Sequence, residues 1–353
     1  MSIVIATAFL ASAGFVAALT PRVAAWARVR GMVDAPDPPG GRRIHAHPTP
    51  LLGGVALYAA FVLALGLVAV LTRAPFEGRI SPFELGAVFL GGLMLVVGGS
   101  LDDRYRLAAS RQLVFPILAV AVVAAAGVGI AKITNPFGGV LRLAPWVTVA
   151  FTVAWLLGTT YTMKFLDGLD GLVSGITAIG ALMIAALSLT TRYRQPDVAV
   201  IALALAGATL GFLAFNFHPA RIFLGEGGST LCGFLLGVLA IISGGKIATA
   251  LLVMGIPVVD VAVVIVQRVV RRESAFRGDR SHLHFRLLDL GFSHRGAVLF
   301  LYALAAGFGT TTLVLQAGEK LVALGVLAVV AVGLSAAAML RNKRTTAPGS
   351  GGR

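Results

Sequence analysis

Long apolar segments alternate with short polar ones along the whole chain. Apolar runs of roughly 20 residues recur, which is the length that crosses a bilayer as an α-helix. We therefore expect an all-α polytopic membrane bundle of about eleven transmembrane helices. The expected limits are 2–21, 52–72, 84–100, 112–131, 146–163, 171–190, 197–214, 229–243, 247–267, 297–315 and 320–340.

The pattern leaves little room for a domain outside the membrane. Residues 1–340 are expected to form a single polytopic domain, and the polar, basic residues 341–353 a disordered tail. The first apolar run lacks a basic segment before it, and its positive residues follow it. We interpret it as a retained first span with the N-terminus outside, rather than a cleaved signal peptide.

Lysine and arginine bias sets the expected orientation. With the N-terminus outside, residues 22–51, 101–111, 164–170, 215–228, 268–296 and the tail lie on the cytoplasmic side. These segments hold about 21 of the 29 Lys and Arg residues, as the positive-inside rule requires. The C-terminus is then cytoplasmic, and the protein is expected to be a multi-pass protein of the inner (plasma) membrane.

Composition narrows the classes of function. The chain is 58% hydrophobic and 12% charged, with a net charge of +14. The basic residues are scattered through short loops, which argues against nucleic acid and favours anionic membrane lipid and a polyanionic substrate. The single cysteine, Cys232, excludes an internal disulfide.

Two pairs of carboxylates fall at the expected inner ends of spans. Asp102 and Asp103 are adjacent and repel each other unless a cation or a proton is shared. Asp167 and Asp170 are spaced i, i+3 in "DGLDG", so they would share one face if that stretch were helical. For both pairs the alternative is a solvated or dipole-compensating position at the membrane boundary.

Further polar residues follow other spans on the same side. In "GEGGST", Glu226 opens the eighth span, Ser229 or Thr230 could cap it, and Gly227 and Gly228 would let the turn move. His282 and His284 are candidate phosphate or metal ligands, or part of a solvated basic loop. Asp260 is expected to be either a structural partner or a contact of the site. Together the carboxylates favour Mg²⁺, or Mn²⁺, with a diphosphate substrate.

The order and wording of these motifs resemble the polyprenyl-phosphate N-acetylhexosamine-1-phosphate transferases. The resemblance extends from "GMVDAPD" to "DRSHLHFRLLDLGFSHR", nearly the whole chain. That family includes the enzymes that prime O-antigen (lipopolysaccharide) and teichoic acid synthesis, and the translocase that makes the first lipid-linked precursor of the cell wall. It implies transfer of a sugar 1-phosphate, N-acetylglucosamine 1-phosphate above all, from UDP-GlcNAc to undecaprenyl phosphate with release of UMP, and it leaves a homodimer open.

The resemblance also implies roles for particular residues. Asp102 and Asp103 match the aspartate pair of the family, with Asp102 the candidate base on the lipid phosphate, and Glu226 and Asp103 are the candidate metal ligands. The expected substrate-binding residues are Arg43, His45, Lys164, Asp167, Asp170, Asn216, Phe223, Arg280, His282 and His284. Asp170 is expected near uracil, Phe223 is expected to stack on it, and the cations complete a positive rim.

The chain departs from the family pattern at several positions. Glu226 replaces an aspartate, Lys164 and Tyr161 replace asparagines, Gln112 stands where a lysine often occurs, and Phe285 replaces a histidine. Lys164 would supply the cation missing at Gln112 if the two faced each other. Four alternatives stay open: a muramyl-pentapeptide phosphotransferase, a CDP-alcohol phosphotransferase, a transporter with carboxylates at mid-membrane depth, and an inactive relative.

Overall fold

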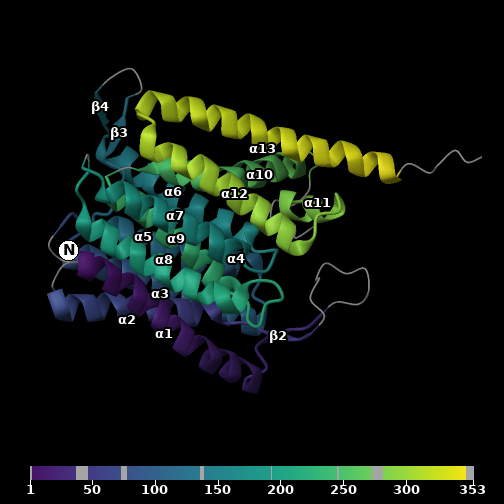
Figure 1. Ribbon diagram of the computed structural model, residues 1–353, viewed down its shortest axis with the longest axis horizontal. Coiled ribbons are helices and arrows are strands. Elements are labelled where there is room, and N and C mark those ends of the chain that lie inside the picture. The colour runs from purple at the N-terminus through teal and green to yellow at the C-terminus, as the bar shows by residue number, and fades with distance from the viewer. Residues whose placement is uncertain are drawn as a thin grey trace, which may run out of the picture.

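The structure is a computed structural model that describes residues 2–36, 47–72, 78–135, 139–191, 193–244, 246–270, 272 and 281–346. Its described part is almost entirely helical (Figure 1). The helices are α1 (Ser2–Val29), α2 (Gly53–Thr72), α3 (Pro82–Tyr105), α4 (Ala109–Gln112), α5 (Val114–Ala125), α6 (Pro145–Leu166), α7 (Leu172–Leu189), α8 (Pro196–Asn216), α9 (Gly225–Ile242), α10 (Ile247–Val270), α11 (Leu283–Asp289), α12 (His294–Val314) and α13 (Ala317–Thr346). Two short hairpins pair β1 (Val33–Asp34) with β2 (Thr49–Pro50), and β3 (Lys132–Thr134) with β4 (Val140–Arg142).

Ten of the helices are long and apolar enough to cross a membrane. They coincide with ten of the expected spans, which confirms the polytopic all-α class. The expected span 112–131 is the exception, because α5 runs only from Val114 to Ala125. Pro116 lies in the first turn of α5, where its missing N–H is tolerated, and Gly127 ends the helix region with a positive φ of 103°.

The helices run side by side along the length of the molecule. In Figure 1, α12 and α13 cover one side of the bundle and α1 and α2 the other, while α4, α11 and β2 lie together at one end, opposite the β3–β4 hairpin. In the best spanning window of α9, 89% of the residues are buried, against 22% for α1 and for α13. Helix α9 is therefore the innermost helix, and α1 and α13 present most of their surface outward.

Helix α9 is wedged against α2 and α3 by contacts between glycines. A Cβ atom on Gly54 of α2 would lie 2.4 Å from the backbone N of Gly228, and one on Gly99 of α3 would lie 2.1 Å from the backbone N of Gly227. These distances leave no room for a side chain. The sequence suggested that Gly227 and Gly228 free the turn to move; the structure shows instead that they let three backbones meet and fix the start of α9.

The C-terminal tail is shorter than the sequence suggested. Helix α13 continues to Thr346, six residues beyond the expected boundary at 340, so part of the stretch expected to be disordered is helical. The residues 347–353 lie outside the described part of the chain.

Candidate active site

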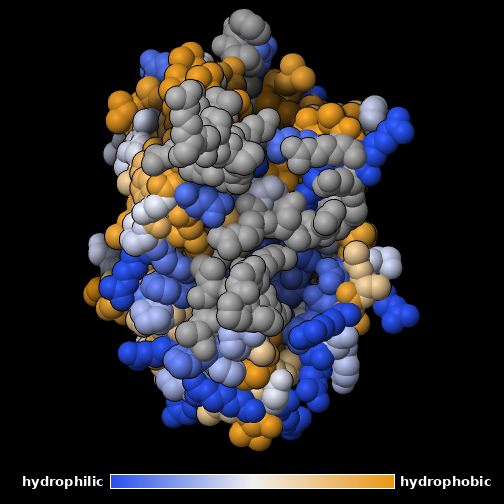
Figure 2. Space-filling view, turned by 90° about the vertical axis from the view of Figure 1, so that its right-hand side faces the viewer, coloured by the Kyte–Doolittle hydropathy of each residue, from blue (hydrophilic) through white to orange (hydrophobic). Residues whose placement is uncertain are grey.

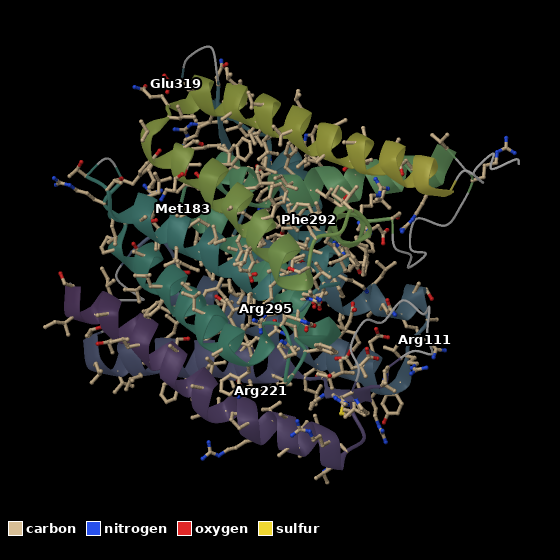
Figure 3. The ribbon with its side chains drawn as sticks, turned by 45° about the vertical axis from the view of Figure 1, so that its right-hand side comes forward. Arg111, Met183, Arg221, Phe292, Arg295 and Glu319 are labelled. Atoms are coloured by element: carbon tan, nitrogen blue, oxygen red, sulfur yellow. The ribbon has the colours of Figure 1, made fainter. Side chains whose placement is uncertain are left out.

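A cavity of about 780 Å³ opens at the end of the bundle where α4 and α11 lie. Figure 2 looks onto this end, and hydrophilic residues gather over its lower half. In Figure 3, Arg111 lies toward this end and Glu319 at the opposite one. The cavity is lined by Val33, Asp34, Leu51, Asp102, Asp103, Arg106, Leu107, Gln112, Asp167, Gly168, Leu169, Asp170, Asn216, Phe223, Gly225, Glu226 and Phe285.

Helix ends supply most of this lining. Helices α3, α6 and α8 reach the cavity with their C-terminal ends, and α9 begins there. Because α3 and α6 both end at the cavity, the chain between them must return along the bundle, and the short α5 makes that return. The carboxylates therefore lie at one end of the bundle, which argues against a transporter with charges at its middle.

A continuous chain of polar contacts joins the two sides of the cavity. Gln112 donates from Nε2 to Asp102 Oδ1 over 3.1 Å and accepts at Oε1 from Lys164 Nζ over 3.0 Å. Lys164 also forms an ion pair with Glu226. This confirms that Lys164 faces Gln112 and brings a cation to that position. The positive charge of Lys164 also offsets the repulsion between Glu226, which it contacts directly, and Asp102, which it reaches through Gln112.

Asp103 occupies the start of α9. The backbone N–H of Glu226 donates to both carboxylate oxygens of Asp103, over 3.2 and 3.3 Å. A carboxylate at a helix N-terminus is favoured both by the free N–H groups and by the helix dipole. Ser229 and Thr230 do not cap α9, as the sequence suggested, because their hydroxyls donate to carbonyls of Gly225 and Glu226 inside the helix. The capping group comes from α3 instead.

The "DGLDG" stretch is a turn between α6 and α7, not a helix. Gly171 adopts a positive φ of 82° at the start of α7, and Gly168 packs so tightly that a Cβ there would lie 2.2 Å from His284 Nε2. Asp167 and Asp170 both line the cavity all the same.

The two aspartates of the turn differ in their surroundings. Burial, followed by the negative charge of Glu226, raises the pKa of Asp167 to about 7. Its side chain is exposed to the cavity, so water there moderates the desolvation. Asp170 accepts hydrogen bonds from His218 and from the backbone N–H of Ala220.

Asn216 is the last residue of α8, and Phe223 lies in the loop between α8 and α9. Asn216 accepts from Ser174 Oγ over 2.8 Å and donates to the carbonyl of Ile222 over 3.0 Å. It therefore anchors the loop that carries Phe223, in addition to lining the cavity. The backbone of Phe223 is held on both sides, because its N–H donates to the carbonyl of Pro50 and its carbonyl accepts from Gly53.

The two histidines of "SHLHF" lie behind the cavity wall. His282 Nδ1 contacts Asp260 Oδ2 at 2.9 Å, so Asp260 is a structural partner of the histidine. The rings of His282 and His284 stack 5.7 Å apart, and both residues are buried outside the cavity lining, whereas Phe285 lines it. A substrate contact by His282 or His284 stays a prediction. Arg43, His45 and Arg280 lie outside the described residues.

Several cavity residues were not singled out from the sequence. Asp34 and Leu51 reach the cavity because the β1–β2 hairpin closes the ends of a long loop, and Arg106 and Leu107 follow α3 directly. The hairpin has two residues in each strand, too short for an alternating pattern. The hydrogen bonds of His218 and His294 to Asp170 join residues 48 and 124 positions apart, which local patterns do not reveal.

The charge balance of the cavity fits a divalent cation. The described residues that line it include six carboxylates and one guanidinium; the carboxylates belong to Asp34, Asp102, Asp103, Asp167, Asp170 and Glu226. Such a lining repels a diphosphate unless cations accompany it. Carboxylate oxygens are also the ligands that Mg²⁺ prefers. The donor set therefore fits the expected metal.

Comparison with known proteins agrees with the sequence motifs. Residues 85–244 match the model of the family described as glycosyl transferase family 4. The chain is 30% identical over 320 residues to a probable undecaprenyl-phosphate N-acetylglucosaminyl 1-phosphate transferase of Bacillus subtilis, covering 88% of this chain and 85% of that protein. It is 35% identical over 365 residues to a decaprenyl-phosphate N-acetylglucosaminephosphotransferase of Mycolicibacterium smegmatis, covering 94% and 89%.

A second group of relatives is also similar. The chain is 33% identical over 267 residues to a phospho-N-acetylmuramoyl-pentapeptide-transferase of Moorella thermoacetica, covering 73% of this chain and 81% of that protein. The motifs, the helical membrane bundle and the acidic cavity agree with these similarities. The chain belongs to the family of polyprenyl-phosphate N-acetylhexosamine-1-phosphate transferases.

Proposed function

We propose that this protein transfers N-acetylglucosamine 1-phosphate from UDP-GlcNAc to a polyprenyl phosphate, undecaprenyl phosphate or a close relative. A phosphate oxygen of the lipid attacks the β-phosphorus of the nucleotide sugar. The bond between that phosphorus and the bridging oxygen breaks, UMP leaves, and a polyprenyl diphosphate-linked sugar forms. This product would start the synthesis of a cell-envelope polysaccharide.

The observation that carries the proposal is the acidic cavity at one end of a membrane bundle. A lipid phosphate approaches from the membrane surface, and a nucleotide sugar approaches from water, so both can meet only where the helices end. The cavity lies at such an end and has a volume of about 780 Å³. The printed names of the relatives from Bacillus subtilis and Mycolicibacterium smegmatis point to the same acceptor and sugar.

The residues divide the work between the two substrates. The lipid phosphate is a nucleophile once ionised, so the protein has mainly to position it, and Asp102 is the group proposed to take its remaining proton. Asp170 follows α6, Asn216 ends α8 and Phe223 lies on the loop after α8; all three line the cavity, and we propose that they bind the nucleotide. Lys164 contacts Gln112, which binds Asp102, and pairs with Glu226, and its proposed role is to balance charge during the transfer.

Asp103 and Glu226 are the residues proposed to hold Mg²⁺ or Mn²⁺. A bound cation supplies charge compensation for the diphosphate. Asp103 is fixed by the N-terminus of α9, and the Glu226 carboxylate is held against Lys164, so both are oriented before substrate binds. The tight packing of Gly227 and Gly228 against α3 and α2 fixes the backbone that follows Glu226.

Turnover by the purified protein tests the proposal. Undecaprenyl phosphate is offered with UDP-GlcNAc, UDP-GalNAc, UDP-glucose or UDP-MurNAc-pentapeptide, and release of UMP is measured. We expect turnover with UDP-GlcNAc, loss of activity in EDTA, and recovery on addition of Mg²⁺ or Mn²⁺. Absence of turnover with every UDP-sugar contradicts the proposed reaction, and full activity of EDTA-stripped protein contradicts the metal.

The similarity to phospho-N-acetylmuramoyl-pentapeptide-transferases supports a second candidate, transfer of phospho-MurNAc-pentapeptide. The same panel separates the two, because only one donor should support fast turnover. The N-acetylglucosamine reading is preferred because the relatives that carry that name match more of the chain.

A further inference from the structure

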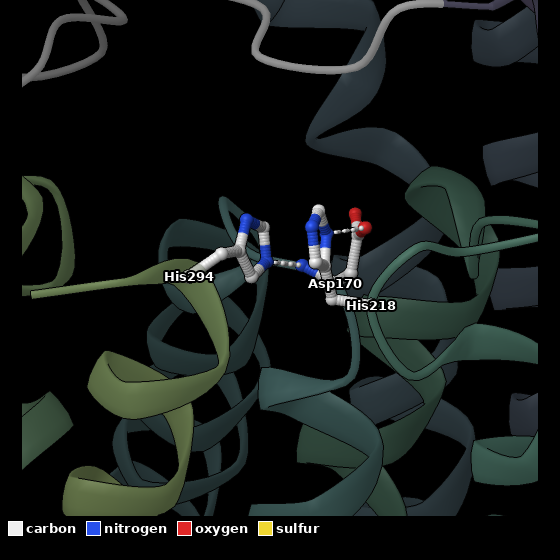
Figure 4. Close-up of side chains that lie close together, drawn as sticks. All are labelled: Asp170, His218 and His294. Atoms are coloured by element: carbon white, nitrogen blue, oxygen red, sulfur yellow. Dashed lines mark hydrogen bonds and ion pairs between the residues drawn. The ribbon is translucent and has the colours of Figure 1, made fainter.

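Asp170 is held at two separate atoms by two histidines. Its carboxylate Oδ2 contacts His218 Nδ1 at 2.8 Å, and its backbone N–H donates to His294 Nε2 over 2.9 Å (Figure 4). The two imidazole rings stack with centroids 4.0 Å apart and planes 14° from parallel. His218 lies on the loop before α9 and His294 is the first residue of α12, so two distant segments hold one residue of the turn between α6 and α7, one at its carboxylate and the other at its backbone N–H.

A metal ion is one explanation for such a cluster, because the three candidate ligand atoms lie within 4.8 Å of one another. The geometry argues against it. A histidine binds a metal through a lone pair in the plane of its ring, and two nearly parallel, stacked rings cannot both direct such a lone pair at one ion. The lone pair of His294 Nε2 also already accepts the backbone N–H of Asp170.

The hydrogen bonds define the protonation of both rings. Nε2 of His294 accepts a backbone N–H, so it carries no proton, and the proton of this neutral ring is on Nδ1. Nδ1 of His218 faces the Asp170 carboxylate, which can only accept a hydrogen bond when ionised. His218 therefore carries a proton on Nδ1 and donates it to this hydrogen bond. The stack therefore orients one ring to accept from Asp170 and the other to donate to it.

Helix α12 makes two further contacts with the same region. Arg295 donates from Nε to the carbonyl of His218 over 2.9 Å, which holds the loop that carries that histidine. Tyr302, two turns farther along α12, donates its hydroxyl to the carbonyl of Gly171, the residue after Asp170. Figure 3 shows Arg295 near the start of α12, beside this loop region. Helix α12 thus supports Asp170 in three ways. His294 binds its backbone N–H, Arg295 holds the loop of His218, and Tyr302 binds the carbonyl of the next residue.

We propose that His294 and Tyr302 are positioning residues that fix the Asp170 carboxylate toward the bound nucleotide. This inference rests on the proposed function, in which Asp170 contacts the nucleotide. Neither residue lines the cavity, so each acts through Asp170 and its turn rather than on substrate. Loss of either contact should loosen the turn, weaken nucleotide binding and leave the chemical step nearly unchanged.

The test compares His294→Ala, His294→Gln, Tyr302→Phe and Asp170→Asn with the unmodified protein. UMP binding is measured by calorimetry and UDP-sugar kinetics by UMP release. We expect His294→Ala to weaken UMP binding and raise KM about tenfold, with kcat within about threefold, as loss of ground-state positioning predicts. His294→Gln keeps an acceptor oxygen and should recover much of the binding. Tyr302→Phe should shift KM in the same direction by a smaller factor.

Thr310→Ala is the matched control, because Thr310 is exposed and lies farther along α12. Unchanged UMP binding in His294→Ala overturns the proposal, as does equal weakening in His294→Ala and His294→Gln. If His294→Ala does not fold, Tyr302→Phe decides, and an unchanged KM there overturns it. Zinc that tightens UMP binding to the unmodified protein but not to His294→Ala favours the metal site instead.

The Asp170→Asn variant separates this inference from the proposed function. If Asp170→Asn binds UMP as well as the unmodified protein does, the role of Asp170 at the nucleotide fails, whatever the histidine variants show. If Asp170→Asn weakens binding and the α12 variants do not, only the positioning inference fails.

Discussion

At the scale of single residues, Lys164 explains how this chain departs from the family pattern without losing a cation. Gln112 stands where the family often has a lysine, and the amine of Lys164 donates to its side chain over 3.0 Å. The same amine pairs with Glu226, which stands where the resemblance implies an aspartate. Lys164 therefore contacts both of these side chains, so a change at either one alters the surroundings of the same amine.

Glu226 gives the sharpest prediction at this scale. Glu226→Gln removes the negative partner of Lys164 and a proposed metal ligand, so we expect kcat to fall about 100-fold or more. Glu226→Asp should recover little activity, since Gly227 and Gly228 are packed against α3 and α2 and the backbone cannot shift to make up one methylene. The measurement is kcat of the folded variants across a Mg²⁺ titration.

Glu84→Gln is the control for that experiment. Glu84 takes part in the capping box at the start of α3, at the other end of the helix from the cavity; glutamine also serves at this position of a capping box, so Glu84→Gln should leave kcat and stability almost unchanged. Turnover of Glu226→Gln at the unmodified rate, with the unmodified Mg²⁺ dependence, removes Glu226 from the metal site.

Gly168 tests the packing of the turn that carries Asp167 and Asp170. A Cβ at this position would lie 2.2 Å from His284 Nε2 and 3.0 Å from the Phe285 ring, so Gly168→Ala must displace the turn or α11. Overpacking of this kind costs about 1–3 kcal/mol, and activity should fall about tenfold or more. Gly158→Ala in α6 meets nothing within 4 Å, so it should leave kcat almost unchanged and stabilise α6 by up to about 1 kcal/mol. Equal activities of the two variants would show that the turn tolerates the shift.

At the scale of elements, the site depends on where α9 begins. Its N-terminus is fixed by the backbones of α2 and α3 through glycine contacts, and Asp103 caps it from α3. The contact between α3 and α9 therefore does two things at once: it packs the bundle, and it sets the positions of Asp103 and Glu226 relative to each other.

Alanine substitutions within α3 separate those contributions. Gly99→Ala places a methyl group 2.1 Å from the backbone N of Gly227, so we expect a loss of roughly 1–3 kcal/mol of stability together with a loss of activity. Gly86→Ala, on the same helix, meets nothing within 4 Å and should stabilise α3 by up to about 1 kcal/mol. Thermal unfolding in detergent measures both. A Gly99→Ala protein as stable as Gly86→Ala would mean that α9 is free to move away.

The elements also show what sequence alone could reveal. Ten spans were predictable because about 20 apolar residues in a row determine a membrane helix by length. Helix α5 was misjudged because apolar residues continue past Ala125, while Gly127 has already left the helical conformation. Five of the six carboxylates of the described cavity lining could be anticipated because each lies at or next to the end of a span. Asp34 and the His218–His294 stack could not, since tertiary contacts alone bring them to the site.

At the scale of the whole molecule, the two ends of the bundle differ in chemistry. One end holds the acidic cavity with α4 and α11, and the other holds the β3–β4 hairpin (Figure 1). A nucleotide sugar made in the cytoplasm reaches the cavity only if that end faces the cytoplasm, which is the orientation that the lysine and arginine bias predicts. The short α5 is essential to this arrangement, because it returns the chain from the cavity end to the hairpin.

Cysteine labelling in intact cells tests both the orientation and the crossing by α5. Ser110 lies in α4 at the cavity end, Val140 in the hairpin, and Thr191 in the loop before α8, and all three side chains are exposed. A membrane-impermeant maleimide should label Val140→Cys and Thr191→Cys, while Ser110→Cys should react only after the cells are permeabilised. The native Cys232 is buried and should not react, so the unmodified protein gives the background signal. Labelling of Ser110→Cys alone would reverse the orientation. Labelling of Thr191→Cys without Val140→Cys would place the hairpin on the cytoplasmic side, which would mean that α5 does not cross the membrane between α3 and α6.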